Sequence, residues 1–167
     1  LIELYKFLIK KCNETRKKVS EDKYKVMKCN SNYKDTLSRA ESVYLNVKIL
    51  DLDKKGIYAK AKPIFNSNLL CYTGITGIYS PFTGEANVNI SSPDIYIPFT
   101  TLHEMAHQRG YASEDEANFI AYLASINHPD IDFKYSGYIL ALNHTANALY
   151  STDYNAYVAL SKNISED

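Results

Sequence analysis

The five residues from His103 to His107 read His-Glu-Met-Ala-His, and their spacing constrains the fold more than any other feature of the chain. On an α-helix, side chains four residues apart project from one face, so both histidines can direct a ring nitrogen at one metal ion about 2 Å away. Glu104 then lies on an adjoining flank, where its carboxylate can take a proton from a water molecule on the metal and return it to a leaving amine. The motif predicts a helix that carries a zinc site with one ion.

A third protein ligand is expected shortly after the motif. The longer pattern H-E-x-x-H-x-x-G-x-x-S matches the metzincin turn at Gly110, but Ser113 stands where that class places histidine or aspartate, and a hydroxyl is a poor zinc ligand. Glu114 and Glu116 follow at the start of a second predicted helix, where they point about 160° apart. We favour Glu114 as the ligand because Asn118, four residues later, shares its face and can hydrogen-bond a ligating side chain. Glu116 suits a capping box with Ser113 instead.

The rest of the sequence predicts an α+β domain that is mainly helical, with a small sheet. Hydrophobic spacing indicates a helical N-terminal part over residues 1–55, with helices near 1–20 and 36–50 and a polar connection between them. Short segments of β-branched and aromatic residues indicate a small sheet over 56–93, with strands near 59–64, 74–79 and 85–90. Residues 94–167 are predicted to form the site helices, near 98–109, 114–126, 130–150 and 153–162. We expect a single domain over 1–167.

Composition excludes some functions and leaves others open. The 19 basic and 19 acidic residues balance, so nothing indicates electrostatic capture of nucleic acid. The three cysteines, Cys12, Cys29 and Cys71, form no C-x-x-C pair, and their disulfide state stays open. No stretch approaches the roughly 20 apolar residues of a membrane span. The chain begins with Leu1, and we expect it to be a segment of a longer protein.

Two resemblances extend this interpretation. The pairing of H-E-x-x-H with E-x-x-A-N-x-x-A resembles the gluzincin peptidases, whose third ligand is a glutamate on a following helix, which implies that Glu114 is the ligand. Several segments are similar to the bacterial DUF3810 family: 77–87, 98–100, 103–110, 113–124 and 135–138. That resemblance implies a zincin-like metallopeptidase domain tethered to a membrane by segments absent from this chain, and we favour the extracytoplasmic side.

Further residues are candidates for substrate contact. The predicted strand at 85–90 is expected to pair through its backbone with an extended peptide or protein substrate, with Asn87 and Asn89 on one face. Tyr111, Tyr135 and Tyr138 are possible donors to the oxyanion that forms during hydrolysis. The remaining histidines are given other roles: His128 as a helix cap and His144 as a packed or exposed residue.

The sequence thus predicts a zinc metallopeptidase in which His103, His107 and Glu114 hold the ion and Glu104 is the general base and acid. Two alternatives stay open. One is a catalytically inactive domain that uses zinc for regulation or interaction, against which the intact Glu104 argues. The other is a helical interaction module without metal.

Overall fold

The computed structural model describes residues 1–46 and 58–165. The helices are α1 (Ile2–Arg16), α2 (Tyr33–Asn46), α3 (Ser67–Leu70), the 3₁₀ turn η2 (Cys71–Thr73), α4 (Ile97–Gln108), α5 (Glu114–Asn127), α6 (Ile131–Thr152) and α7 (Tyr154–Ser161). The strands are β1 (Ser20–Glu21), β2 (Met27–Lys28), β3 (Lys62–Pro63), β4 (Gly77–Ser80) and β5 (Glu85–Val88). The fold is therefore mainly helical with small sheets, which confirms the predicted α+β class.

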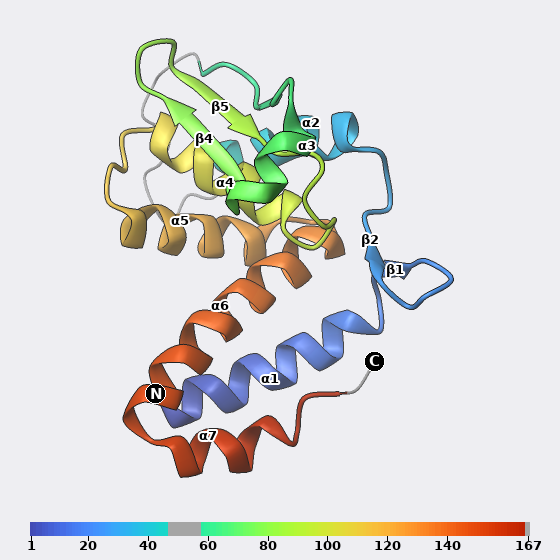
Figure 1. The fold of residues 1–167 in the computed structure, drawn as a ribbon, viewed down its shortest axis with the longest axis vertical. Coiled ribbons are helices and arrows are strands. Elements are labelled where there is room, and N and C mark those ends of the chain that lie inside the picture. Colours follow the sequence, from blue (N-terminus) through green and yellow to red (C-terminus); the bar gives the residue numbers. More distant parts are fainter. Residues whose placement is uncertain (47–57, 166–167) are drawn as a thin grey trace.

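A three-stranded sheet covers one side of α4, and α5 packs against another (Figure 1). The strand order is β3-β5-β4, with β5 parallel to β3 and antiparallel to β4. Alternation along β5 points Ala86 and Val88 into the core, where both are fully buried. Leu102, Met105 and Ala106 of α4 meet them in the same apolar cluster. The motif helix is thus held between the sheet and α5.

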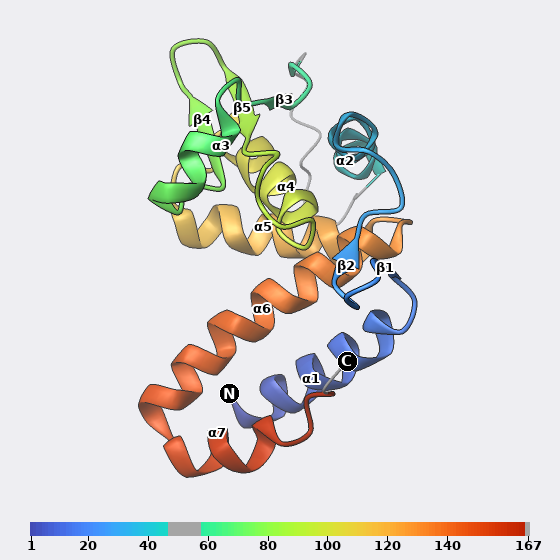
Figure 2. The same cartoon turned by 45° about the vertical axis from the view of Figure 1, so that its right-hand side comes forward.

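The long helix α6 joins this part of the molecule to a second apolar cluster. Its first half packs on α4 and α5, and its second half packs on α1 and α7 (Figure 2). Tyr5 and Leu8 of α1 meet Leu142 and Leu149 of α6 in this cluster, and all four are buried. Among the described residues, no helix combines the length and the apolar character that crossing a bilayer requires.

The predicted elements agree with the structure except at short segments. The connection predicted after the first helix contains the antiparallel pair β1–β2, whose turn is held by Asp22 accepting hydrogen bonds from the backbone of Tyr24 and Val26. The short helix α3 was not predicted. The strand predicted at 59–64 shortens to two residues, and part of the helix predicted at 36–50 lies outside the described residues.

Candidate metal centre

The two motif histidines lie on one face of α4, one turn apart. Pro98 stands in the first turn of this helix, where its missing N–H leaves no backbone hydrogen bond unmade. The Nε2 atoms of His103 and His107 lie 3.0 Å apart, and their rings meet edge to face. Two ring nitrogens this close to each other can bind the same metal ion.

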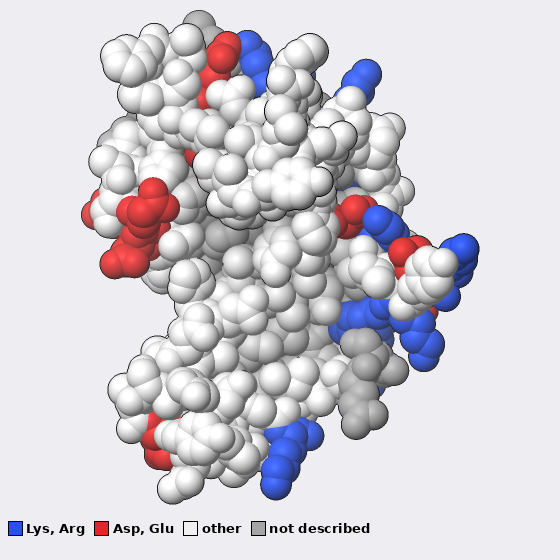
Figure 3. All heavy atoms as spheres, in the orientation of Figure 1, with Lys and Arg blue, Asp and Glu red and all other residues white. Residues whose placement is uncertain are grey.

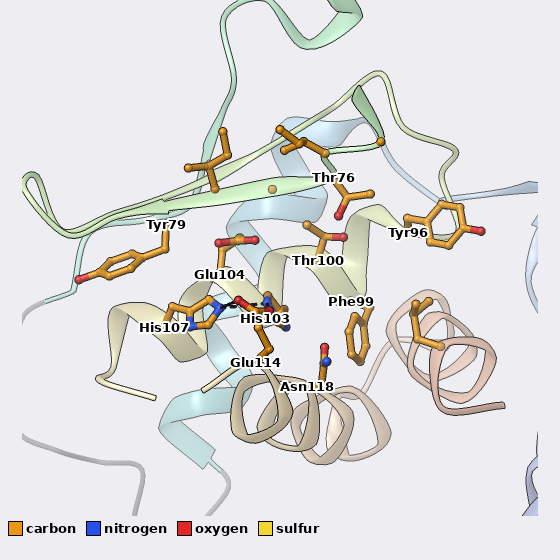
Figure 4. A pocket seen from close by; sticks show the side chains of 15 residues that line it. Thr76, Tyr79, Tyr96, Phe99, Thr100, His103, Glu104, His107, Glu114 and Asn118 are labelled. Carbon is orange, nitrogen blue, oxygen red and sulfur yellow. Dashed lines mark hydrogen bonds and ion pairs between the residues drawn. The ribbon is translucent and has the colours of Figure 1, made fainter. Parts of the chain in front are cut away.

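The chain then reverses within a few residues and returns Glu114 to the histidines. Gly110 makes the turn possible because its φ of +95° is a conformation that side chains with a Cβ rarely adopt. Ser113 is the N-cap residue of α5, and Glu114 is the first residue of that helix. The Glu114 carboxylate oxygens lie 3.2 Å from Nε2 of His103 and 3.4 Å from Nε2 of His107 (Figure 4). Glu116 is exposed, and the side chain of Ser113 forms no capping hydrogen bond, so the expected capping box is absent.

Hydrogen bonding prepares the imidazole of His107 for a metal. Its Nδ1 lies 2.7 Å from the backbone carbonyl oxygen of Tyr111. A carbonyl can only accept, so the proton must be on Nδ1 and the lone pair on Nε2 faces His103 and Glu114. Tyr111 therefore reaches the site through its backbone rather than through its phenol.

His103 is prepared by burial and by Asn118. Burial and the neighbouring His107 lower the pKa of His103, which favours the neutral ring that a metal requires. A hydrogen bond with the Asn118 side chain has the opposite effect and raises the pKa of His103. Nδ1 of His103 is buried without a hydrogen-bond partner of good geometry among the described residues. Asn118 is thus the neighbouring side chain that can support His103, as a hydrogen-bonding residue beside a metal ligand does.

The spacing of the three ligand groups fits one small metal ion. One ligand atom from each of His103, His107 and Glu114 can be chosen so that all lie within 4.8 Å of one another. A tetrahedral ion with bonds of about 2.0–2.1 Å places its ligands about 3.3–3.4 Å apart. The observed distances of 3.0, 3.2 and 3.4 Å lie close to that edge length. Two imidazole nitrogens and a carboxylate therefore fit a divalent metal.

Glu104 points away from the ligand triangle toward strand β4. Its side chain is buried, and burial together with the charge of Glu114 raises its pKa to about 7. The backbone of Tyr79 on β4 hydrogen-bonds the carboxylate and acts against this rise. A Cβ on Gly77 would lie 2.5 Å from Oε1 of Glu104, so only glycine allows the strand to pass this close. Strand β4 thus sets the position of the carboxylate.

A cavity of about 680 Å³ opens over these groups. One wall is the chain from Gly74 to Tyr79, and the other is made by α4 and the start of α5. Figure 4 shows Tyr79 at one end and Tyr96 at the other, with Glu104, His103 and Glu114 between them. The rings of Tyr79 and Phe99 stack on His107 and His103, with centroids 6.3 and 6.4 Å apart. Its volume lies in the usual range of ligand-binding pockets.

The prediction that the strand at 85–90 pairs with substrate is wrong. β5 has partners on both sides, β3 and β4, so its backbone is not free to add another strand. Asn87 on β5 lies opposite Ile78 on β4, and its side chain hydrogen-bonds the backbone of Glu85. It does not line the cavity. Asn89 is buried and hydrogen-bonds the backbone of Ile75. The edge strand beside the cavity is β4, which pairs with β5 alone among the described strands.

Two of the three tyrosines predicted as oxyanion donors also lie elsewhere. Tyr135 is buried with Val19 and Met27 in a small apolar cluster, and Tyr138 packs against the α1–α6 cluster beside Tyr122. Neither lines the cavity. The predicted roles of both residues are therefore corrected to packing.

The other two histidines lie outside the metal centre. His128 follows α5 as its C-cap residue, but it is buried against Phe133, and burial lowers its pKa. The predicted position at the helix end is therefore confirmed, while burial favours the neutral form of the ring. His144 is exposed on α6, as predicted.

Sequence reasoning missed the contribution of β4. Gly77 and Tyr79 position Glu104, while Thr100 and Phe99 of α4 line the cavity beside it. The available signal was Gly77 itself, because a glycine inside a predicted strand indicates a close approach of another group.

A comparison with protein families places the chain. The model of the family described as "Protein of unknown function (DUF3810)" matches residues 1–167. The chain therefore belongs to the DUF3810 family. No curated protein and no solved structure matches the chain.

Proposed function

We propose that this chain is a zinc-dependent metallopeptidase with a zincin-like arrangement, in which His103, His107 and Glu114 hold one zinc ion. The observation that carries the proposal is the ligand triangle with the Glu104 carboxylate beside it at the same cavity. A purely structural zinc site closes with a fourth protein ligand and needs no such carboxylate. The three ligands here leave room for water and substrate.

Zinc is favoured by the chemistry of the donors. Two neutral imidazole nitrogens and one carboxylate are a common ligand set of catalytic zinc, whereas magnesium and calcium prefer oxygen ligands alone. A zinc ion held by these residues would supply Lewis-acid polarisation of water and of a peptide carbonyl.

Glu104 is the proposed general base and acid. Its carboxylate faces the cavity and is held by the backbone of Tyr79, so it can take the proton from an attacking water molecule. The same carboxylate can then deliver that proton to the amine nitrogen of the cleaved bond. Proton transfer of this kind contributes about 10²–10⁴ to a rate.

A peptide substrate is favoured by the free edge of β4. Among the strands that the structure describes, Gly77–Ser80 pair with β5 alone, and the other edge lies beside the cavity. An extended peptide can add to such an edge through backbone hydrogen bonds, which requires no particular sequence. Its scissile bond would then lie along the line of Glu104 and the ligand triangle.

Metal removal and restoration test the proposal. The protein is incubated with a mixed peptide library after zinc loading, after chelation, and after addition of zinc back to the chelated sample. We expect cleavage in the first and third samples and none in the second. Stoichiometric zinc without cleavage of any peptide would instead favour a zinc-binding regulatory domain. Absence of zinc after loading would exclude both.

A further inference from the structure

A long part of the chain beside the cavity carries no charge. From Pro63 to Gly84 there is no Asp, Glu, Lys, Arg or His. This segment includes the end of β3, α3, η2, β4 and the whole β4–β5 turn. Charged residues make up 23% of the whole chain, so such a gap in an exposed segment is unusual.

Large apolar side chains of this segment point into solvent. Phe65 is 96% exposed, Tyr72 is 91% exposed and Phe82 is 98% exposed, while Leu69 is 66% exposed. A single exposed apolar residue is ordinary, but four on one uncharged segment indicate contact with something apolar. We call these four residues, three of which are aromatic, the aromatic surface.

The aromatic surface belongs to the sheet layer, away from the α1–α7 end of the molecule. Figure 3 shows the face over α3, β4 and β5 free of charged groups except at its upper margin. Ile75 and Ile78 are also exposed, and both line the cavity over the metal centre. Exposed apolar side chains of the same segment therefore also lie at the rim of the cavity.

We propose that the aromatic surface inserts into the interfacial region of a lipid bilayer. Phe65, Tyr72 and Phe82 project from three separate turns, which suits a fluid phase that adapts to each side chain better than it suits a rigid protein pocket. Aromatic side chains are enriched at the boundary between headgroups and acyl chains, and a segment without charge carries no desolvation penalty for ions there. The bilayer recognised this way need not be anionic.

This inference goes beyond the proposed function and does not depend on it. If both hold, the cavity opens next to the bilayer surface, because Ile75 and Ile78 lie on its rim. The substrate would then be a polypeptide at or near that surface.

Single tryptophan reporters test the insertion. The chain contains no tryptophan, so Phe65→Trp, Tyr72→Trp and Phe82→Trp each give one fluorophore without background. The control is Tyr24→Trp, which is 72% exposed beside Lys23 and Lys25 on the β1–β2 turn. Each protein is mixed with vesicles of phosphatidylcholine alone and with vesicles that contain brominated phosphatidylcholine. We expect a blue shift and quenching at positions 65, 72 and 82 and neither at position 24.

Vesicle sedimentation separates the alternatives. The triple variant Phe65→Ser/Tyr72→Ser/Phe82→Ser is expected to lose about tenfold or more of the partitioning of the unmodified chain into phosphatidylcholine vesicles. Circular dichroism shows whether the variant is folded, and the reporters test the proposal even if it is not. No shift at any reporter would overturn the proposal. Binding only to vesicles that contain anionic phosphatidylglycerol would also overturn it. A fluorescence shift that appears without vesicles and rises with protein concentration would overturn it too, because it would indicate a second copy of the chain as the partner.

Discussion

A carboxylate oxygen of Glu114 lies 3.2 Å from Nε2 of His103, although the two residues belong to different helices. The turn at Gly110 makes this contact possible, because it reverses the chain directly after α4 and brings the first residue of α5 back over the motif. The group that could hold a metal ion is therefore built from two consecutive helices.

Loss of Glu114 should weaken zinc binding far more than loss of its neighbour. Glu114→Ala removes one of three ligands, so we expect zinc affinity to fall by more than about a hundredfold. Glu116→Ala is the matched control, since Glu116 is exposed in the same helical turn and lies outside the metal-binding group. Competition with a chromophoric chelator measures both. A larger loss in Glu116→Ala would show that the wrong glutamate has been assigned.

Asn118 should contribute through His103 rather than by binding the metal. We expect Asn118→Ala to lower zinc affinity by about 10–100-fold, less than Glu114→Ala, because the imidazole loses a polar neighbour and not its place in the site. Asn127→Ala at the other end of α5 is the control, since its side chain hydrogen-bonds the backbone of Leu123. Equal zinc affinities of the two variants would show that Asn118 does not support His103.

Gly77 should matter for catalysis more than for metal binding. In Gly77→Ala the new Cβ meets Oε1 of Glu104 and the methyl group of Thr100, so the carboxylate must move. A displacement of about 1 Å can cost about a hundredfold in kcat. Zinc content should stay stoichiometric, because no ligand is touched. Asn87→Ala, on the neighbouring strand β5 opposite Ile78 and outside the cavity lining, is the control for kcat. Unchanged kcat in Gly77→Ala would mean that β4 does not position Glu104.

The stability of the fold should depend on pH through His128. Burial lowers the pKa of His128 in the folded chain below the unfolded value of about 6.5, so the unfolded state binds the proton first as pH falls. Its stabilising contribution is therefore present above about pH 6.5 and is lost below it. Urea unfolding at pH 7.5 and pH 5.5 should show a larger loss of stability in the unmodified chain than in His128→Gln. The same loss in both would place the pH dependence elsewhere.

Much of the fold and the metal-binding group was predictable because both follow from local spacing. Helical periodicity located α1, α4, α5 and α6, and the face that Glu114 shares with Asn118 favoured Glu114 over Glu116 before any contact was known. What failed depended on contacts between distant segments. The choice between β4 and β5 as edge strand is set by the pairing of β3 with β5, which no local pattern contains. Likewise, nothing in the sequence around Tyr135 or Tyr138 indicates which face of α6 meets the cavity.

The most direct test of a zinc peptidase is to remove the proposed base and keep the metal. Glu104→Gln replaces the carboxylate with a neutral group of the same size and leaves His103, His107 and Glu114 intact. Zinc content by elemental analysis and cleavage of a peptide that the unmodified chain hydrolyses are measured on the same sample. We predict one zinc ion per chain and a loss of cleavage of at least about a hundredfold. Cleavage at the unmodified rate would contradict it.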